Sequence, residues 1–66
     1  MIRHFYFIEN ETGEEFIVGA ENLLEAKTAA QEIGDDIARN YGCYPDVTYE
    51  YEMTDEEAEM SGLDEY

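Results

Sequence analysis

Carboxylates are the most numerous residues in this sequence that could do chemistry. The chain holds 18 Asp and Glu residues against three Lys and Arg, so its formal net charge at pH 7 is −15. Closely spaced carboxylates can share a proton in acid–base catalysis, or they can bind a hard cation such as Ca²⁺. The densest run lies in VTYEYEMTDEEAEM, residues 47–60, where no basic residue interrupts the acids.

Neither chemistry has a supporting motif. The acidic run lacks the D-x-D-x-D-G spacing and the distant Glu of an EF-hand loop, so only weak, non-specific cation binding is expected. Among so many acids, no single carboxylate pair is distinguished as an acid–base dyad. Cys43 and His4 are the only possible nucleophile and base, and they lie on different predicted elements. The sequence therefore predicts no enzyme, no metal site and no cofactor.

Size and composition predict one folded domain over residues 1–66. Hydrophobic residues make up 44% of the chain and aromatics 14%, which exceeds the content of a typical disordered segment. A chain this short buries only about 60% of the surface that its unfolded state exposes, so the core is small.

Cysteine content and the N-terminal sequence predict a protein of the host-cell cytoplasm. Cys43 is the single cysteine, which is typical of a reducing compartment. The segment MIRHFYFIENE has too short an apolar run for a signal peptide. No stretch approaches the roughly 18 apolar residues of a membrane span.

Two strands are predicted at the start of the chain. IRHFYFIE, residues 2–9, is rich in aromatic and β-branched residues, and EFIVG, residues 15–19, has the same character. The intervening NETGE, residues 10–14, is typical of a turn, because Gly13 can adopt a positive φ. The pattern predicts a β-hairpin.

A long helix is predicted next. Asn22 is a suitable N-cap with Glu25 three residues later, and Gly42 suits the C-terminal end. The apolar residues at helical spacing are Leu23, Ala26, Ala30, Ile33, Ile37 and Tyr41. Gly34 costs about 1 kcal/mol relative to Ala, but the periodicity continues through it, so we expect one helix, bent at most at Gly34–Asp35.

A third strand and a short helix complete the chain. VTYEYEM, residues 47–53, alternates apolar and polar side chains after the loop CYPD, residues 43–46. Thr54 and Glu57 then form a capping-box pattern, which predicts a short helix over residues 55–60. Ser61 and Gly62 end this helix, and residues 61–66 are expected to form a tail that can fray.

These elements predict an α+β fold of the order β-β-α-β plus a short C-terminal helix. The helix returns the chain to the start of strand two, so strand three runs parallel to strand two and antiparallel to strand one. The most apolar strand, the first, suits the centre of the sheet. We therefore expect a three-stranded sheet in the order 2-1-3, with a right-handed crossover and the long helix on one face.

Strand alternation divides the side chains between the two faces of this sheet. The core under the long helix is expected to contain Phe5, Phe7, Phe16, Val18, Val47, Tyr49 and Tyr51. The open face is expected to carry His4, Tyr6, Ile8, Glu15, Ile17, Thr48, Glu50 and Glu52. Apolar residues on the open face need a cover. Either the C-terminal segment supplies it, through Ala58, Met60 or Leu63, or a partner molecule does.

The acids are predicted to form two rows. Residues two apart on a strand are about 6.6 Å apart, and residues three or four apart on a helix are about 5–6 Å apart. The first row consists of Glu50, Glu52, Asp55, Glu56, Glu57 and Glu59. The second lies on the outer side of the long helix and consists of Glu32, Asp35 and Asp36. No Lys or Arg follows Arg39.

This charge restricts the possible partners. DNA, RNA and anionic membranes are poor partners, because like charges repel and no basic patch can displace counterions. A basic protein surface is a good partner. A rigid acidic surface could fill the groove in which a nucleic-acid enzyme binds the phosphate backbone. The alternative is an acidic face that serves solubility only, as in halophilic proteins.

In length and in the acids of YEYEMTDEEAEM and EIGDD, the chain resembles the small acidic proteins with which phages and mobile elements block nucleic-acid enzymes. Within that class it is similar to the anti-CRISPR proteins that inhibit Cas9-type effectors. The resemblance implies an inhibitor that occupies the PAM-reading or heteroduplex channel and excludes target DNA. These inhibitors share no common motif, so no residue role is carried over.

Two functions from different classes follow. The first is a DNA mimic that binds a basic nucleic-acid-binding protein, with a Cas9-type effector preferred. The second is a small homodimeric structural or regulatory protein, paired through Tyr6, Ile8 and Ile17 on the open sheet face. The protein is accordingly expected to be a monomer or a homodimer. A fold that depends on a bound cation is a third alternative.

Overall fold

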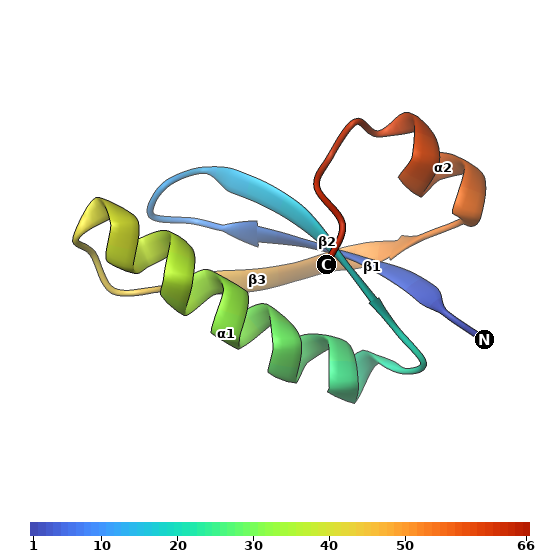
Figure 1. Ribbon diagram of the computed structural model, residues 1–66, viewed down its shortest axis with the longest axis horizontal. Coiled ribbons are helices and arrows are strands. Elements are labelled where there is room, and N and C mark those ends of the chain that lie inside the picture. The colour runs from blue at the N-terminus through green and yellow to red at the C-terminus, as the bar shows by residue number, and fades with distance from the viewer.

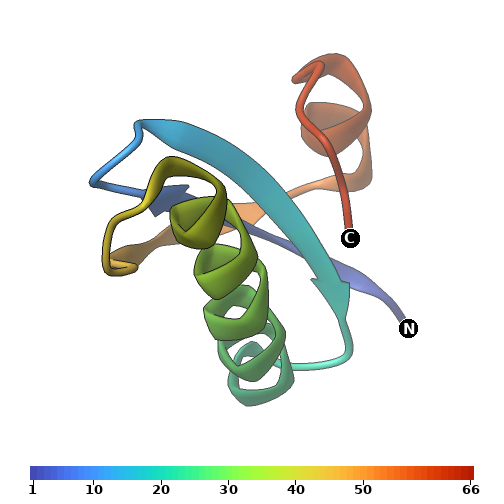
Figure 2. The ribbon, with the colours of Figure 1, turned by 60° about the vertical axis from the view of Figure 1, so that its left-hand side comes forward.

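The computed structural model describes residues 1–66 as three strands and two helices in the predicted order. The elements are β1 (Arg3–Glu9), β2 (Glu14–Ala20), α1 (Leu23–Tyr41), β3 (Val47–Met53) and α2 (Asp55–Met60). The strand order is β2-β1-β3, and β1 pairs antiparallel with both neighbours. Figure 1 and Figure 2 show α1 crossing one side of the sheet, with α2 on the other side. The predicted α+β fold is therefore confirmed.

Local signals at the element ends have the predicted geometry. The Asn22 side chain accepts a hydrogen bond from the Glu25 amide, and Gly42 is left-handed with φ 74°. Thr54 and Glu57 form both hydrogen bonds of a capping box. Gly13 has φ 78° in the β1–β2 turn, where a residue with a side chain would be strained.

Helix α1 packs against the sheet through small residues. Its buried positions are Ala26, Ala30, Gly34 and Ala38, which recur every four residues. A Cβ atom at Gly34 would lie 2.3 Å from Cγ2 of Val47, so this glycine allows α1 to approach β3 closely. The helix continues through Gly34 without interruption, as predicted. Tyr41, which was expected on the buried face, is mostly exposed.

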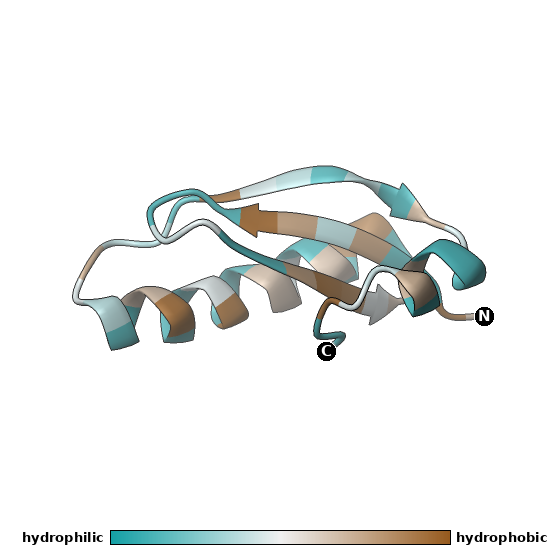
Figure 3. Cartoon of the chain, turned by 90° about the horizontal axis from the view of Figure 1, so that it is seen from above, coloured by the Kyte–Doolittle hydropathy of each residue, from teal (hydrophilic) through white to brown (hydrophobic).

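The core under α1 is built on the aromatic residues of the hairpin. Phe5, Phe7 and Phe16 are each 1% exposed, and the rings of Phe7 and Phe16 stack with centroids 5.8 Å apart. Val47 and Tyr49 pack against this cluster from β3. Figure 3 shows hydrophobic residues in β1 and β2, whereas α2 begins with hydrophilic residues.

A β-bulge in β3 corrects part of the predicted face assignment. Phe7 pairs with Tyr49 but Tyr6 pairs with Tyr51, so the register shifts by one residue at Glu50. Because neighbouring strand residues point to opposite faces, a shift of one residue exchanges the faces beyond it. Tyr51 therefore lies on the open face, not in the core under α1, and its ring centroid is 5.1 Å from that of Tyr6.

The same shift moves Glu52 off the open face. It pairs with Phe5, whose side chain belongs to the core under α1. Met53 moves in the opposite sense, and it is buried on the open face. The clean alternation of VTYEYEM continues through the bulge, so the sequence pattern did not reveal it.

The C-terminal segment covers the open face. Tyr6, Ile17, Met53 and Ala58 form a second buried cluster, against which Ile8 and Leu63 pack. Of the two covers that the sequence left open, the structure has the internal one, through Ala58 and Leu63, while Met60 is exposed. Of the apolar residues that motivated a homodimer, Tyr6 and Ile17 are thus buried within the chain and Ile8 is partly buried.

Residues 64–66 lie along the outer edge of β2 and are not a free tail. The amide of Ile17 donates to the carbonyl of Asp64 at 2.9 Å, and the Ile17 carbonyl accepts from the Tyr66 amide at 2.8 Å. The Gly19 amide donates to the Tyr66 carbonyl at 2.9 Å. Glu65 and Ile17 form a parallel bridge, so this segment extends the sheet beyond β2.

Candidate functional site

His4 links β1 to both parts of the C-terminal region. Its Nε2 lies 2.6 Å from Oδ1 of Asp55 at the start of α2, and its Nδ1 is hydrogen-bonded to Glu65. The His4 side chain is only 17% exposed. The hydrogen bond with Glu65 raises the pKa of His4, that with Asp55 adds to the rise, and burial opposes it. The charged form of His4 therefore fixes α2 and the C-terminal segment to β1.

Glu52 is paired with the basic residue nearest to it. Arg3 donates from Nε to Oε2 of Glu52 at 2.9 Å and from Nη2 to Oε1 at 2.7 Å. The guanidinium also lies over the Phe5 ring, 5.1 Å from its centroid. The hydrogen bond from Arg3 lowers the pKa of Glu52. The charge of Glu52 is therefore largely neutralised within the chain.

The acids of α2 divide into those that hold the helix and those that face solvent. Asp55 bonds to His4, and the Glu57 side chain accepts the Thr54 amide at 3.0 Å. Glu56 and Glu59 are exposed and form no ion pair, and neither does Glu50 at the bulge. We call these three residues the free acids. The structure thus leaves half of the predicted first row without an internal partner.

The second predicted row lies on a different surface. Glu32, Asp35 and Asp36 lie on α1, on the other side of the sheet from α2 (Figure 2). Asp36 lies 3.5 Å from Arg39, one turn along the same helix, whereas Glu32 and Asp35 form no ion pair. The two predicted rows are therefore separate surfaces, and the structure does not join them into one.

Glu9 is a buried carboxylate that the sequence analysis did not single out. It is 0% exposed and accepts the Asp46 amide at 2.6 Å, the Thr12 amide at 2.8 Å and the Thr12 hydroxyl at 3.1 Å. Burial works to raise its pKa, but these hydrogen bonds outweigh burial and lower it. Glu9 thus joins the β1–β2 turn to the loop before β3. One signal was present, since alternation places position 9 on the face of Phe5 and Phe7.

Tyr6 and Glu15 form a polar contact at the margin of the open face. The Tyr6 hydroxyl donates to a carboxylate oxygen of Glu15. This hydrogen bond, together with burial and the nearby negative charge, raises the pKa of Tyr6 to about 12. Tyr6 is therefore a neutral donor, and its contact with Glu15 reinforces the packing of the open face.

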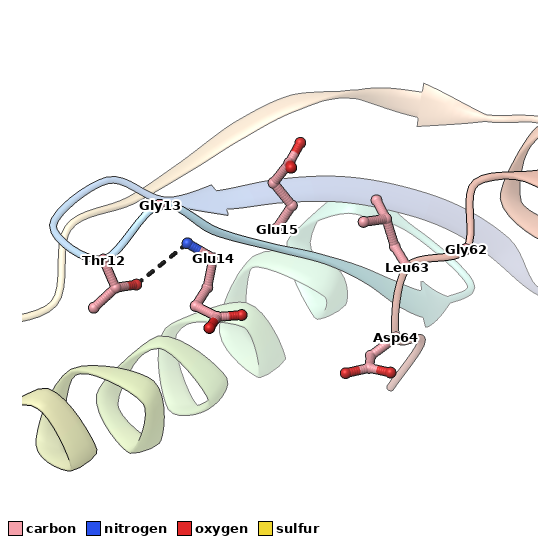
Figure 4. A pocket seen from close by; sticks show the side chains of 7 residues that line it. All are labelled: Thr12, Gly13, Glu14, Glu15, Gly62, Leu63 and Asp64. Carbon is pink, nitrogen blue, oxygen red and sulfur yellow. Dashed lines mark hydrogen bonds between the residues drawn. The ribbon is translucent and has the colours of Figure 1, made fainter.

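An acid-lined hollow lies between the β1–β2 turn and the C-terminal segment. Its volume is about 350 Å³, and its lining includes Glu14, Glu15 and Asp64. Figure 4 shows Glu14 and Asp64 on one side of β2 and Glu15 on the other, so the carboxylates do not converge. No group of three or more His, Cys, Asp or Glu side chains in the chain is arranged to hold a metal ion.

Comparison with known proteins gave no relatives: no family model, curated protein or solved structure matches the chain. Neither helix combines the length and the apolar character that crossing a membrane requires.

Proposed function

We propose that this protein is an inhibitor that binds the basic nucleic-acid-binding surface of a nucleic-acid enzyme in the host-cell cytoplasm. Its carboxylates occupy the positions at which the enzyme binds the phosphates of a nucleic acid. A Cas9-type effector is the preferred target, on the basis of the resemblance given above. The protein binds no nucleic acid itself, because its net charge of −15 repels phosphates.

The observation that carries this proposal is the fixed attachment of α2 to the sheet. The capping box of Thr54 and Glu57 begins the helix, Ala58 is buried, and Asp55 is bonded to His4. The free acid Glu59 lies on the same short helix. A surface whose charges are held in place loses less conformational entropy on binding than a flexible acidic tail does.

The spacing of the free acids suits a row of basic side chains. Glu56 and Glu59 are three residues apart on α2, which places their Cβ atoms about 5–6 Å apart. Duplex DNA carries one negative charge per about 1.7 Å of axis, and its binding proteins meet these charges with Lys and Arg. Within the first row, only Glu52 and Asp55 pair with basic side chains, which are those of Arg3 and His4.

The test is inhibition of target-DNA binding by a panel of guide-loaded Cas9-type effectors and other basic nucleic-acid enzymes. We expect the wild-type protein to compete with DNA at low salt and to lose affinity as salt increases. A variant with Glu50, Glu56 and Glu59 changed to Lys should lose at least about tenfold in inhibition, since each reversal replaces an attraction by a repulsion.

The matched control changes Glu11, Glu21 and Glu25 to Lys. These acids are exposed and lie outside both predicted acidic rows, and the control alters the net charge by the same amount. If both triple variants inhibit as well as the wild type does, mimicry by α2 and β3 is wrong. If both lose inhibition equally, only the total charge matters, and the defined surface is wrong.

A further inference from the structure

The chain covers one edge of its sheet and leaves the other open. On the outer side of β2, Ile17 and Gly19 form three backbone hydrogen bonds of 2.8–2.9 Å with residues 64–66. β3 is the opposite edge strand, and β1 is its only neighbour in the sheet. No backbone hydrogen bond outside the β1–β3 ladder involves Val47–Met53. The outer side of β3, which we call the β3 edge, is therefore unpaired over seven residues.

The pairing register shows which backbone groups point out of the β3 edge. Ile17 directs its N–H and C=O away from β1, so Tyr6 opposite it directs its own groups toward β3. Tyr51 lies opposite Tyr6, so its N–H and C=O are directed toward β1. Because backbone groups alternate along a strand, those of the next residue, Glu52, point outward.

The other half of β3 follows the same rule. Ile8 lies two residues from Tyr6 and also directs its groups toward β3, where Thr48 is its partner. The groups of the following residue, Tyr49, therefore point outward. A docked strand would find free donors and acceptors at Tyr49 and Glu52, on either side of the bulge.

The charge of this edge selects the strand that can dock. Glu50 is a free acid, and Asp46 precedes the strand without an ion pair. A second copy of the chain would place like charges opposite one another, which destabilises strand pairing. An extended segment rich in Lys or Arg carries the opposite charge, so these carboxylates attract it.

We propose that the β3 edge binds an extended, cationic segment of a partner protein as an added strand. Main-chain hydrogen bonds supply affinity in this mode, and the alternating side chains supply specificity. The inference rests on the proposed function, since both require a basic partner, and it specifies how that partner is held. The acids of α2 then lie just beyond the end of the docked strand, next to Met53.

The experiment is amide hydrogen exchange, measured by NMR on the ¹⁵N-labelled protein. The probe is a seven-residue peptide of alternating Lys and Val, which matches the length of β3. A peptide with the same number of Lys residues between Gly and Ser is the control, because it carries equal charge without strand propensity. We expect the alternating peptide to slow exchange at Tyr49 and Glu52 by at least about tenfold, and the control peptide to leave both unchanged.

Three outcomes would overturn the inference. The two peptides could slow exchange equally at the amides of Tyr49 and Glu52, or neither peptide could slow it. Alternatively, protection could be present in the free protein and increase with its concentration, which would make a second copy the occupant. Glu50→Lys should weaken binding of the alternating peptide more than Glu21→Lys, which lies beyond β2 on the opposite edge.

Failure of this inference is distinguishable from failure of the proposed function. If an effector is inhibited but Tyr49 and Glu52 still exchange rapidly in its complex, the acidic surface acts without strand addition. If the alternating peptide protects both amides but no nucleic-acid enzyme is inhibited, the β3 edge binds cationic strands and the inhibitor function is wrong.

Discussion

His4 is the only histidine of the chain, and both of its ring nitrogens are bonded to carboxylates. These bonds raise its pKa in the folded protein above the ordinary value of about 6.5. The stabilisation is complete below about pH 6.5 and is lost as the pH rises through the raised pKa. The acidic helix is therefore held most firmly at slightly acidic pH.

Replacing His4 by Gln should remove this dependence. We expect the melting temperature of the wild type to fall between about pH 6.5 and pH 9 and that of His4→Gln to change less, because Gln does not titrate. Thermal unfolding followed by circular dichroism measures both curves. Parallel curves for the two proteins would show that the contacts with Asp55 and Glu65 do not depend on the charge of His4.

Glu9 should matter for stability as much as a core residue does. Glu9→Gln places an amide among the N–H and O–H donors of Asp46 and Thr12, so we expect a loss of about 1–3 kcal/mol in the free energy of unfolding. Urea denaturation at pH 7 measures this loss in the free energy of unfolding. Glu11→Gln is the matched control, since this exposed neighbour should change stability by less than about 0.5 kcal/mol.

The acid response of Glu9 has a definite sign. Its lowered pKa means that its contribution is present above about pH 4.3 and is lost as the pH falls through the pKa of the folded protein. The stability difference between the wild type and Glu9→Gln should therefore shrink in strong acid. A difference that stays constant down to about pH 2 would contradict the role of the carboxylate.

At the level of the elements, a substitution at Gly34 tests how closely α1 approaches β3. Gly34→Ala should lower stability by about 1 kcal/mol or more, because overpacking against Val47 costs about 1–3 kcal/mol and outweighs the helix propensity of Ala. Asn40→Ala, at an exposed position of α1, measures the propensity effect alone. Urea denaturation compares the variants.

The proposed clash has a direct test in a double-mutant cycle. Val47→Ala removes the Cγ2 atom that a Cβ at Gly34 would meet at 2.3 Å. Gly34→Ala should then cost less in the Val47→Ala protein than in the wild type, by about 1 kcal/mol. Additive effects of the two substitutions would exclude this contact as the cause.

The elements that have local sequence signals were predictable, whereas the β-bulge in β3 has no such signal and was not. The caps at Asn22 and Thr54 and the turn glycine Gly13 are decided by residues within a few positions. The bulge at Glu50 is decided by distant partners. Beyond it, Met53 is buried against the cluster that includes Ala58. Periodicity within one strand contains no information on such partners.

The sequence predicted which residue types make up the candidate site, but it predicted their arrangement only in part. The sequence located the acids, but it did not show which of them are used internally. Glu52 is paired by Arg3, which is 49 residues away in the chain, and Asp55 by His4, which is 51 residues away. Pairings at that separation depend on the sheet register, so spacing along the chain could not predict them.

Taken as a whole, the molecule carries far more negative charge than it neutralises, and salt should stabilise it. Screening shortens the Debye length from about 10 Å at 0.1 M to about 3 Å at 1 M, which relieves repulsion among the exposed acids. We expect the melting temperature to rise over this range of NaCl. An unchanged value would mean that the internal contacts already compensate the charge.

The same series with CaCl₂ at equal ionic strength separates screening from binding. Because no group of side chains is arranged to hold a metal ion, both salts should raise the melting temperature by similar amounts. A much larger effect of Ca²⁺ would favour the cation-dependent fold and contradict screening as the cause.

β1 has a consequence for cooperativity, because it contributes side chains to both buried clusters. Phe5 and Phe7 belong to the layer beneath α1, and Tyr6 belongs to the layer beneath α2. Neither layer can melt without loosening the strand that they share. A ligand that binds only α2 would therefore also slow unfolding of the layer beneath α1. Calorimetry of any complex should record one concerted transition.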